Sequence, residues 1–183
     1  VARALGALLP EGAIVSDEGN TSSLFAPGLT AGTPRHDWLT LTGGAIGQGL
    51  PVATGAAVAC PDRKVLSLQA DGSAMYTIQA LWSAANQKLP VVFVVCNNGG
   101  YRILKQRLKA FHGNEQFVGM DFVEPTVDFV GLAKSMGLEA HRISDPAALE
   151  HASEDLVRAR LREWDDTSIH VPARPCVAID ELD

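Results

Sequence analysis

The run PVVFVVC, at Pro90–Cys96, is the feature that most constrains the fold of this chain. It is apolar throughout and rich in β-branched residues, as expected of a strand that has both faces covered. The run KVLSLQ, at Lys64–Gln69, has a similar character. Strands buried on both faces are typical of parallel sheets that carry helices on either side. The two runs therefore predict an α/β fold.

Strand-like and helix-like segments alternate along the rest of the chain. We expect residues 1–183 to form one domain with an open, mainly parallel sheet and helices on both of its faces. We also expect this chain to be a piece of a longer polypeptide. The further strands are predicted at 13–16, 38–42, 138–142 and 176–179. One helix is predicted at 47–59, with Pro51 in its first turn. A second helix is predicted to begin at Ser73 as N-cap and to carry an apolar stripe of Ile78, Leu81, Trp82 and Ala85. Two more helices are predicted, at 129–136 with Gly137 as the stop and at 146–163. The stretch 109–125 is irregular and reads as a loop.

Three predicted strands end in small and polar residues, after Ser16, Gln69 and Cys96. Ligands of open parallel sheets sit outside the carboxyl ends of the strands. We therefore interpret the three ends as parts of one site. Simple turns at Asp71-Gly72 and Asn97-Asn98-Gly99 are the alternative interpretation of each end taken alone.

Asp71 lies between a buried strand and a helix, where backbone N–H groups favour a phosphate. A carboxylate and a phosphate repel each other unless a cation lies between them. Mg²⁺ meets this need, because it prefers hard oxygen ligands and often binds through one or two protein groups plus phosphates. Asn98 can add a side-chain oxygen and Gly100 a backbone carbonyl. The pattern predicts a magnesium site at Asp71, Asn98 and Gly100.

The segment ADGSAMYTIQALWSAANQKLPVVFVVCNNGGY resembles the thiamine diphosphate motif, in which Gly-Asp-Gly is followed after a fixed interval by Asn-Asn. The segment TGGAIGQGLPVATGAAVACPDRKVLSLQADGS resembles the preceding part of benzoylformate decarboxylase and its relatives. The resemblance covers roughly residues 13–180. It departs from the motif at Ala70, which replaces the first glycine, and at Gly100, where some relatives have threonine.

The resemblance implies a role for each matching position. Asp71, Asn98 and Gly100 would hold magnesium. Gly44 would contact the aminopyrimidine of thiamine diphosphate, and Ile46 would be the apolar wedge that bends the cofactor, although an ordinary core residue is the alternative for Ile46. The residues implied to line the diphosphate are Gly19, Asn20, Gly72, Ser73, Tyr101, Ile103 and Leu104.

The same resemblance implies a thiamine diphosphate-dependent decarboxylase or carboligase acting on 2-keto acids, benzoylformate decarboxylase-like, with an acetolactate synthase-like enzyme as the alternative. Its activating glutamate would lie on a pyrimidine-binding domain of a partner subunit, within a homodimer or homotetramer. Glu18 lies beside the diphosphate end and is not assigned that role, so no catalytic residue is expected here. We expect the 183 residues alone to be inactive.

Two other classes remain open. The glycines at 43, 44, 47 and 49 could mark a nucleotide-binding module, although G-x-G-x-x-G is absent. The second of these classes is a non-catalytic domain, and the presence of both Asp71 and Asn98 argues against it. Arg102 and Lys105 could face an anionic substrate or solvent. His112 is the one histidine that could lie near a substrate, although an exposed loop residue is the favoured interpretation.

A formal net charge of −6 offers no electrostatic reason to bind nucleic acid or an anionic membrane. No apolar stretch approaches the ~20 residues of a membrane-spanning helix. The three cysteines form no Cys-x-x-Cys pair, which disfavours a zinc site and fits a reduced, cytoplasmic setting.

Overall fold

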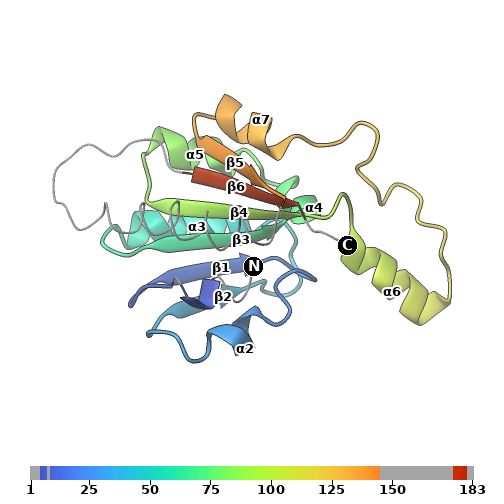
Figure 1. The fold of residues 1–183 in the computed structure, drawn as a ribbon, viewed down its shortest axis with the longest axis horizontal. Helices are drawn as coiled ribbons and strands as arrows, with labels where there is room; N and C mark the ends of the chain where they lie inside the picture. Colours follow the sequence, from blue (N-terminus) through green and yellow to red (C-terminus); the bar gives the residue numbers. More distant parts are fainter. Residues whose placement is uncertain (1–4, 8, 145–174, 181–183) are drawn as a thin grey trace.

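The computed structural model of the chain describes residues 5–7, 9–144 and 175–180. In this part of the chain six strands form one sheet in the order β2-β1-β3-β4-β6-β5, and all neighbouring strands of this sheet are parallel (Figure 1). The predicted α/β fold with a parallel sheet is confirmed. The strands are β1 (Ile14–Glu18), β2 (Asp37–Thr40), β3 (Val65–Ala70), β4 (Val91–Asn97), β5 (Glu139–Ile143) and β6 (Pro175–Asp180).

The two runs that predicted the fold form the centre of the sheet. All of β3 is buried, as is β4 up to Cys96. Their register places Ala70 opposite Cys96, so both strands end at the same edge. On the other side of β3, Glu18 of β1 pairs with Gln69. The ends of β1, β3 and β4 therefore meet, as the polar clusters in the sequence predicted.

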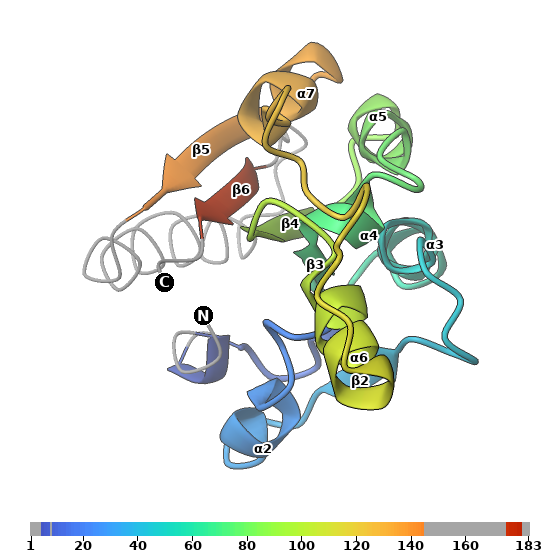
Figure 2. The ribbon, with the colours of Figure 1, turned by 90° about the vertical axis from the view of Figure 1, so that its right-hand side faces the viewer.

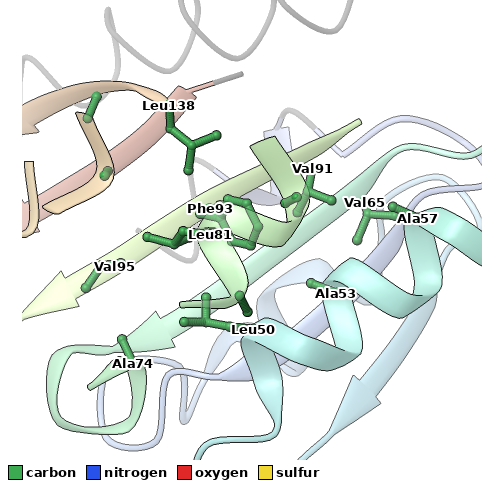
Figure 3. Close-up of a cluster of buried hydrophobic side chains, with 14 of the residues drawn as sticks. Leu50, Ala53, Ala57, Val65, Ala74, Leu81, Val91, Phe93, Val95 and Leu138 are labelled. Carbon is green, nitrogen blue, oxygen red and sulfur yellow. The ribbon is translucent and has the colours of Figure 1, made fainter. Parts of the chain in front are cut away.

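One face of the sheet is covered by α3 (Gly49–Ala59), α5 (Ala80–Asn86) and α7 (Phe129–Ser135) (Figure 2). Leu50, Ala53 and Ala57 project from α3 onto the sheet, where Phe93 and Leu81 fill the space between the layers (Figure 3). Small residues on α3 permit this close packing, as in a dense protein interior.

The opposite face carries a second apolar cluster. Leu5, Leu9 and Ala26, the last in α2 (Ala26–Thr30), pack with β-strand residues such as Leu68 and Val94. Helical segments therefore lie on both faces of the sheet. The predicted helix at 146–163 lies outside the described residues.

The helix predicted after Asp71 is divided. α4 (Asp71–Ala74) is a single turn, and α5 begins only at Ala80. The predicted N-cap role of Ser73 is wrong, because Ala70 is the N-cap and Ser73 lies inside α4. Trp82, which was placed in the inward stripe, is largely exposed, while Leu81 is buried.

The predicted loop at 109–125 begins too early. α6 (Arg102–His112) continues to His112 and ends at Gly113, which adopts the left-handed conformation. α6 has no buried residue and extends beyond the carboxyl ends of the strands (Figures 1 and 2). Leu104, Leu108 and Phe111 recur at helical spacing in this segment, so the sequence carried a periodic signal that the loop prediction overlooked. None of the described helices has the length and apolar character needed to cross a bilayer.

Candidate functional site

Asp71 joins two strand ends. It is fully buried at the junction of β3 and α4. Its Oδ1 accepts a hydrogen bond from the Gly72 N–H at 2.8 Å, and its Oδ2 accepts one from the Gly100 N–H at 3.0 Å. One carboxylate therefore fixes the turn after β4 against the end of β3. The predicted metal ligand Asp71 and the 98–100 turn are brought together.

The electrostatics of Asp71 suit a cation. Burial raises the pKa of the Asp71 carboxyl above its ordinary value, and the backbone N–H groups of Gly72, Gly100, Gly99 and Asn98 offset part of that rise. Burial disfavours a bare negative charge, and a nearby positive ion would compensate for the lost hydration.

Asn98 presents an oxygen without a partner. Its Oδ1 is buried and has no hydrogen-bond partner among the described residues. Buried acceptors that remain unsatisfied are uncommon and destabilising, and an ion is one of the recognised explanations. The Gly100 carbonyl accepts the Arg102 N–H at 3.1 Å and has a second lone pair available.

The donor set fits magnesium better than zinc. The described part of the chain contains no group of three or more His, Cys, Asp or Glu that could hold a metal ion. One carboxylate with neutral oxygens suits a hard cation that takes its remaining ligands from phosphate and water. The residues present therefore fit a magnesium ion.

The end of β1 contacts the same region. Asn20 Nδ2 donates to Ser73 Oγ at 2.8 Å, and Asn20 has a positive φ of 50°. Gly19 has no room for a side chain, because a Cβ there would lie 2.7 Å from the Ser23 Cβ. The predicted diphosphate residues Gly19, Asn20 and Ser73 thus lie together at the ends of β1 and β3.

Tyr101 packs directly on Gly72. A Cβ at Gly72 would lie 2.7 Å from Cδ1 of the Tyr101 ring. Phe122 lies beside the same contact, because its ring centroid is 4.9 Å from that of Tyr101 and a Cβ at Gly72 would lie 3.6 Å from its Cε2. Ile103 and Leu104 follow in the first turn of α6, where Ile103 is half-buried and Leu104 is exposed.

The segment after α6 folds back on the 98–100 turn. The Phe122 N–H donates to the Gly99 carbonyl at 2.7 Å, and the Tyr101 N–H donates to the Met120 carbonyl at 2.9 Å. Lys105, left open by the sequence, forms an ion pair with Asp121 in this segment. The 98–100 turn is therefore held from both sides, by Asp71 and by residues 120–122.

The predicted aminopyrimidine contacts lie in a different turn. Gly44 is exposed with a φ of 70°, and Ile46 is half-buried. The sequence analysis did not identify the residue that holds this turn, which is Glu18. Glu18 is only 2% exposed, and its two oxygens accept hydrogen bonds from the Gly47 and Gly49 N–H groups at 2.5 and 2.6 Å. A glutamate at the end of an otherwise buried strand was the available signal.

Comparison with known proteins gives one family match. The model of the thiamine pyrophosphate enzyme C-terminal TPP binding domain matches residues 17–164.

Individual relatives carry two kinds of name. A Mycobacterium tuberculosis protein assigned as an acetolactate synthase large subunit, IlvX, is 55% identical over 76% of this chain. Benzoylformate decarboxylase of Pseudomonas aeruginosa is 35% identical over 85% of it. The chain spans less than a third of these relatives, 28% and 29% respectively. The solved structure of a Rhodococcus jostii thiamine diphosphate-dependent 4-hydroxybenzoylformate decarboxylase superposes with a TM-score of 0.76 at 31% identity, covering 98% of this chain and 31% of that one.

Proposed function

The chain belongs to the thiamine pyrophosphate enzyme family, as a C-terminal TPP-binding domain, and we propose that it holds the cofactor's diphosphate through one Mg²⁺ at the ends of β3 and β4. The observation that carries this proposal is the pairing of two buried groups. The Asp71 carboxylate is tied to the 98–100 turn, and the Asn98 Oδ1 lacks any partner among the described residues. The Gly100 carbonyl completes the proposed ligand set.

Residues around this ion bind and orient the diphosphate. The Asn20–Ser73 contact supports a role for Gly19, Asn20, Gly72 and Ser73, and the packing of Tyr101 on Gly72 supports Tyr101. Ile103, Leu104, Gly44 and Ile46 rest on the family resemblance alone.

The proposed reaction is the decarboxylation of a 2-keto acid, as in benzoylformate decarboxylase-like enzymes. The cofactor, when bound, would supply a nucleophilic thiazolium carbon and an electron sink for decarboxylation, whereas the protein supplies placement and electrostatics. The names of the Pseudomonas and Rhodococcus relatives support this reaction class.

An acetolactate synthase-like carboligase is the second candidate. The 55% identity to the IlvX protein favours it. Product analysis of the native polypeptide with benzoylformate and with pyruvate separates the two. Benzaldehyde from benzoylformate supports the decarboxylase, and acetolactate from pyruvate supports the carboligase.

We further propose that residues 1–183 form one domain that works with a pyrimidine-binding domain of a partner subunit. The assembly would be a homodimer or homotetramer in the cytoplasm. The free thiol of Cys60 fits a reducing compartment.

Calorimetry with thiamine diphosphate, with and without Mg²⁺, tests the binding proposal. We expect strictly magnesium-dependent binding that Asp71→Ala abolishes and Asn98→Ala weakens at least about tenfold, since a charged interaction is worth roughly 1.5–3 kcal/mol. Asp62→Ala, an exposed acidic residue in the turn before β3, is the matched control and should bind normally. Preference for a dinucleotide would support the nucleotide-binding alternative, and no binding of either would support a non-catalytic domain.

A further inference from the structure

We propose that Glu18 is a positioning residue that sets the place of the 43–49 turn, and through it the aminopyrimidine end of the cofactor, separately from the metal at Asp71. The inference rests on the proposed function, in which Gly44 and Ile46 of this turn contact the cofactor ring. It assigns to Glu18 a role that neither the metal ligands nor the diphosphate contacts require.

The Glu18 carboxylate holds the base of the turn directly. Glu18 is the last residue of β1 and is buried. Oε1 accepts the Gly47 N–H at 2.5 Å, and Oε2 accepts the Gly49 N–H at 2.6 Å. Hydrogen bonds to a charged acceptor are about twice as strong as neutral ones, and here both oxygens are used. The position of the carboxylate therefore determines the positions of two peptide groups in the turn.

Two hydroxyl groups hold the same glycines from their carbonyl side. Thr77 Oγ1 donates to the Gly47 carbonyl at 2.7 Å, and Ser16 Oγ donates to the Gly49 carbonyl at 2.8 Å. Both glycines are thus fixed at N–H and at C=O, by side chains from β1 and from the turn between α4 and α5.

The base of the turn has no space in which to shift. A Cβ at Gly49 would lie 2.1 Å from Gln69 Nε2, and a Cβ at Gly47 would lie 2.7 Å from the Tyr76 Cβ. Gly47 also has a φ of +94°, which disfavours any side chain. Close packing and hydrogen bonding therefore act together at this point.

The rest of the turn depends on this base. Residues 42–45 are exposed, and a Cβ at Gly43 or at Gly44 would meet nothing within 4 Å. Ala45 N–H donates to the Thr42 carbonyl at 3.2 Å, a bond internal to the turn. Residues 42–45, the tip of the turn, make few contacts with the rest of the protein. The positions of Gly44 and Ile46 therefore depend on the direction of the backbone at Gly47.

A purely structural role for Glu18 makes a different prediction. Gly49 is the first residue of α3, so a carboxylate at its N–H also stabilises the start of that helix. Capping alone would change the stability of the protein and would not distinguish one end of the cofactor from the other.

The test compares two ligands in the native polypeptide that carries this sequence. Glu18→Gln keeps the shape of the side chain but directs an NH₂ donor at one of the two N–H groups. We expect its Kd for thiamine diphosphate, at saturating Mg²⁺, to rise at least about tenfold. The Kd for inorganic pyrophosphate with Mg²⁺ should stay within about twofold, because that ligand lacks the ring. Asp37→Asn, an acidic residue at the opposite edge of the sheet paired with Arg63, should change neither.

Equal weakening of both ligands, or no weakening of thiamine diphosphate, would overturn the positioning role. If Glu18→Gln does not fold, Thr77→Val decides, since it removes one hydroxyl bond from the same turn with little change in shape. It should weaken thiamine diphosphate several-fold and leave pyrophosphate unchanged, and unchanged binding of both would refute the inference. Wild-type protein that fails to bind thiamine diphosphate would instead refute the proposed function.

Discussion

At the scale of single residues, the site retains groups that are poor for stability. Asp71 is a fully buried carboxylate, and the Asn98 Oδ1 is a buried acceptor without a partner in the described chain. Unsatisfied buried polar atoms destabilise by about 1–3 kcal/mol each. Such groups persist where function requires them, which is consistent with a cation held between two strand ends.

Two helical glycines test how tightly the site is packed. Gly72→Ala would force the Tyr101 ring to move, because the new Cβ would lie 2.7 Å from it. We expect a loss of about 1–3 kcal/mol in the free energy of unfolding and weaker cofactor binding. Gly55→Ala is the matched control, since a Cβ there meets nothing within 4 Å and helix propensity predicts a gain of about 0.5–1 kcal/mol. Chemical denaturation measures both, and equal effects would contradict the packing account.

At the scale of elements, local pattern predicted some segments and failed at others. The strands at the centre of the sheet follow from their own residues, because β-branched runs buried on both faces need no distant information. The break between α4 and α5 does not, and within it Thr77 Oγ1 donates to the carbonyl of Gly47, which lies far away in the chain. The helical periodicity of apolar residues carries no information about such a long-range contact.

The same distinction applies to the site. The pairing of Asp71 with the turn at Asn98 could be predicted, because each follows a strand and parallel strands end at one edge. The partner groups of Glu18 could not, since Gly47 lies 29 residues further along and joins Glu18 only in the folded chain. The ion pair between Lys105 and Asp121 could not be predicted either, because these residues also meet only in the folded chain.

The ion pair between Lys105 and Asp121 fastens the 120–122 segment to α6, next to the 98–100 turn. Asp121→Asn should therefore speed limited proteolysis at residues 113–119 and weaken Mg²⁺ binding modestly. The free energy of unfolding should change by less than about 1 kcal/mol, because the pair is partly exposed.

Glu115→Gln provides the comparison for that variant. It removes the ion pair between Lys109 and Glu115, which lies on the exposed side of the same region. Its proteolysis rate at the flanking residues and its Mg²⁺ affinity should match those of the wild type. Equal effects of the two substitutions would show that the Asp121 contact does not support the metal-binding turn.

At the scale of the whole molecule, apolar side chains remain uncovered in several places. Phe25 near α2 is 74% exposed, Phe111 on α6 is 70% exposed, and Val118 is 87% exposed. Single exposed apolar residues are ordinary on a protein surface, whereas a contiguous apolar patch often marks a contact surface. The chain spans less than a third of its curated relatives, so these side chains are candidates for contacts with the rest of the native polypeptide.

Residues 1–183 taken alone should not turn over a 2-keto acid. Glu18 is buried at the end of β1, and its two oxygens accept the Gly47 and Gly49 N–H groups, so we assign it to the 43–49 turn and not to activation of a cofactor ring. The family resemblance implies that an activating glutamate lies on a separate pyrimidine-binding domain. Carbon dioxide release from benzoylformate, with thiamine diphosphate and Mg²⁺ present, should therefore stay at background for the isolated chain and rise clearly for the native polypeptide. Comparable rates would mean that these residues contain the proton acceptor themselves, and the division of labour between two domains would then be wrong.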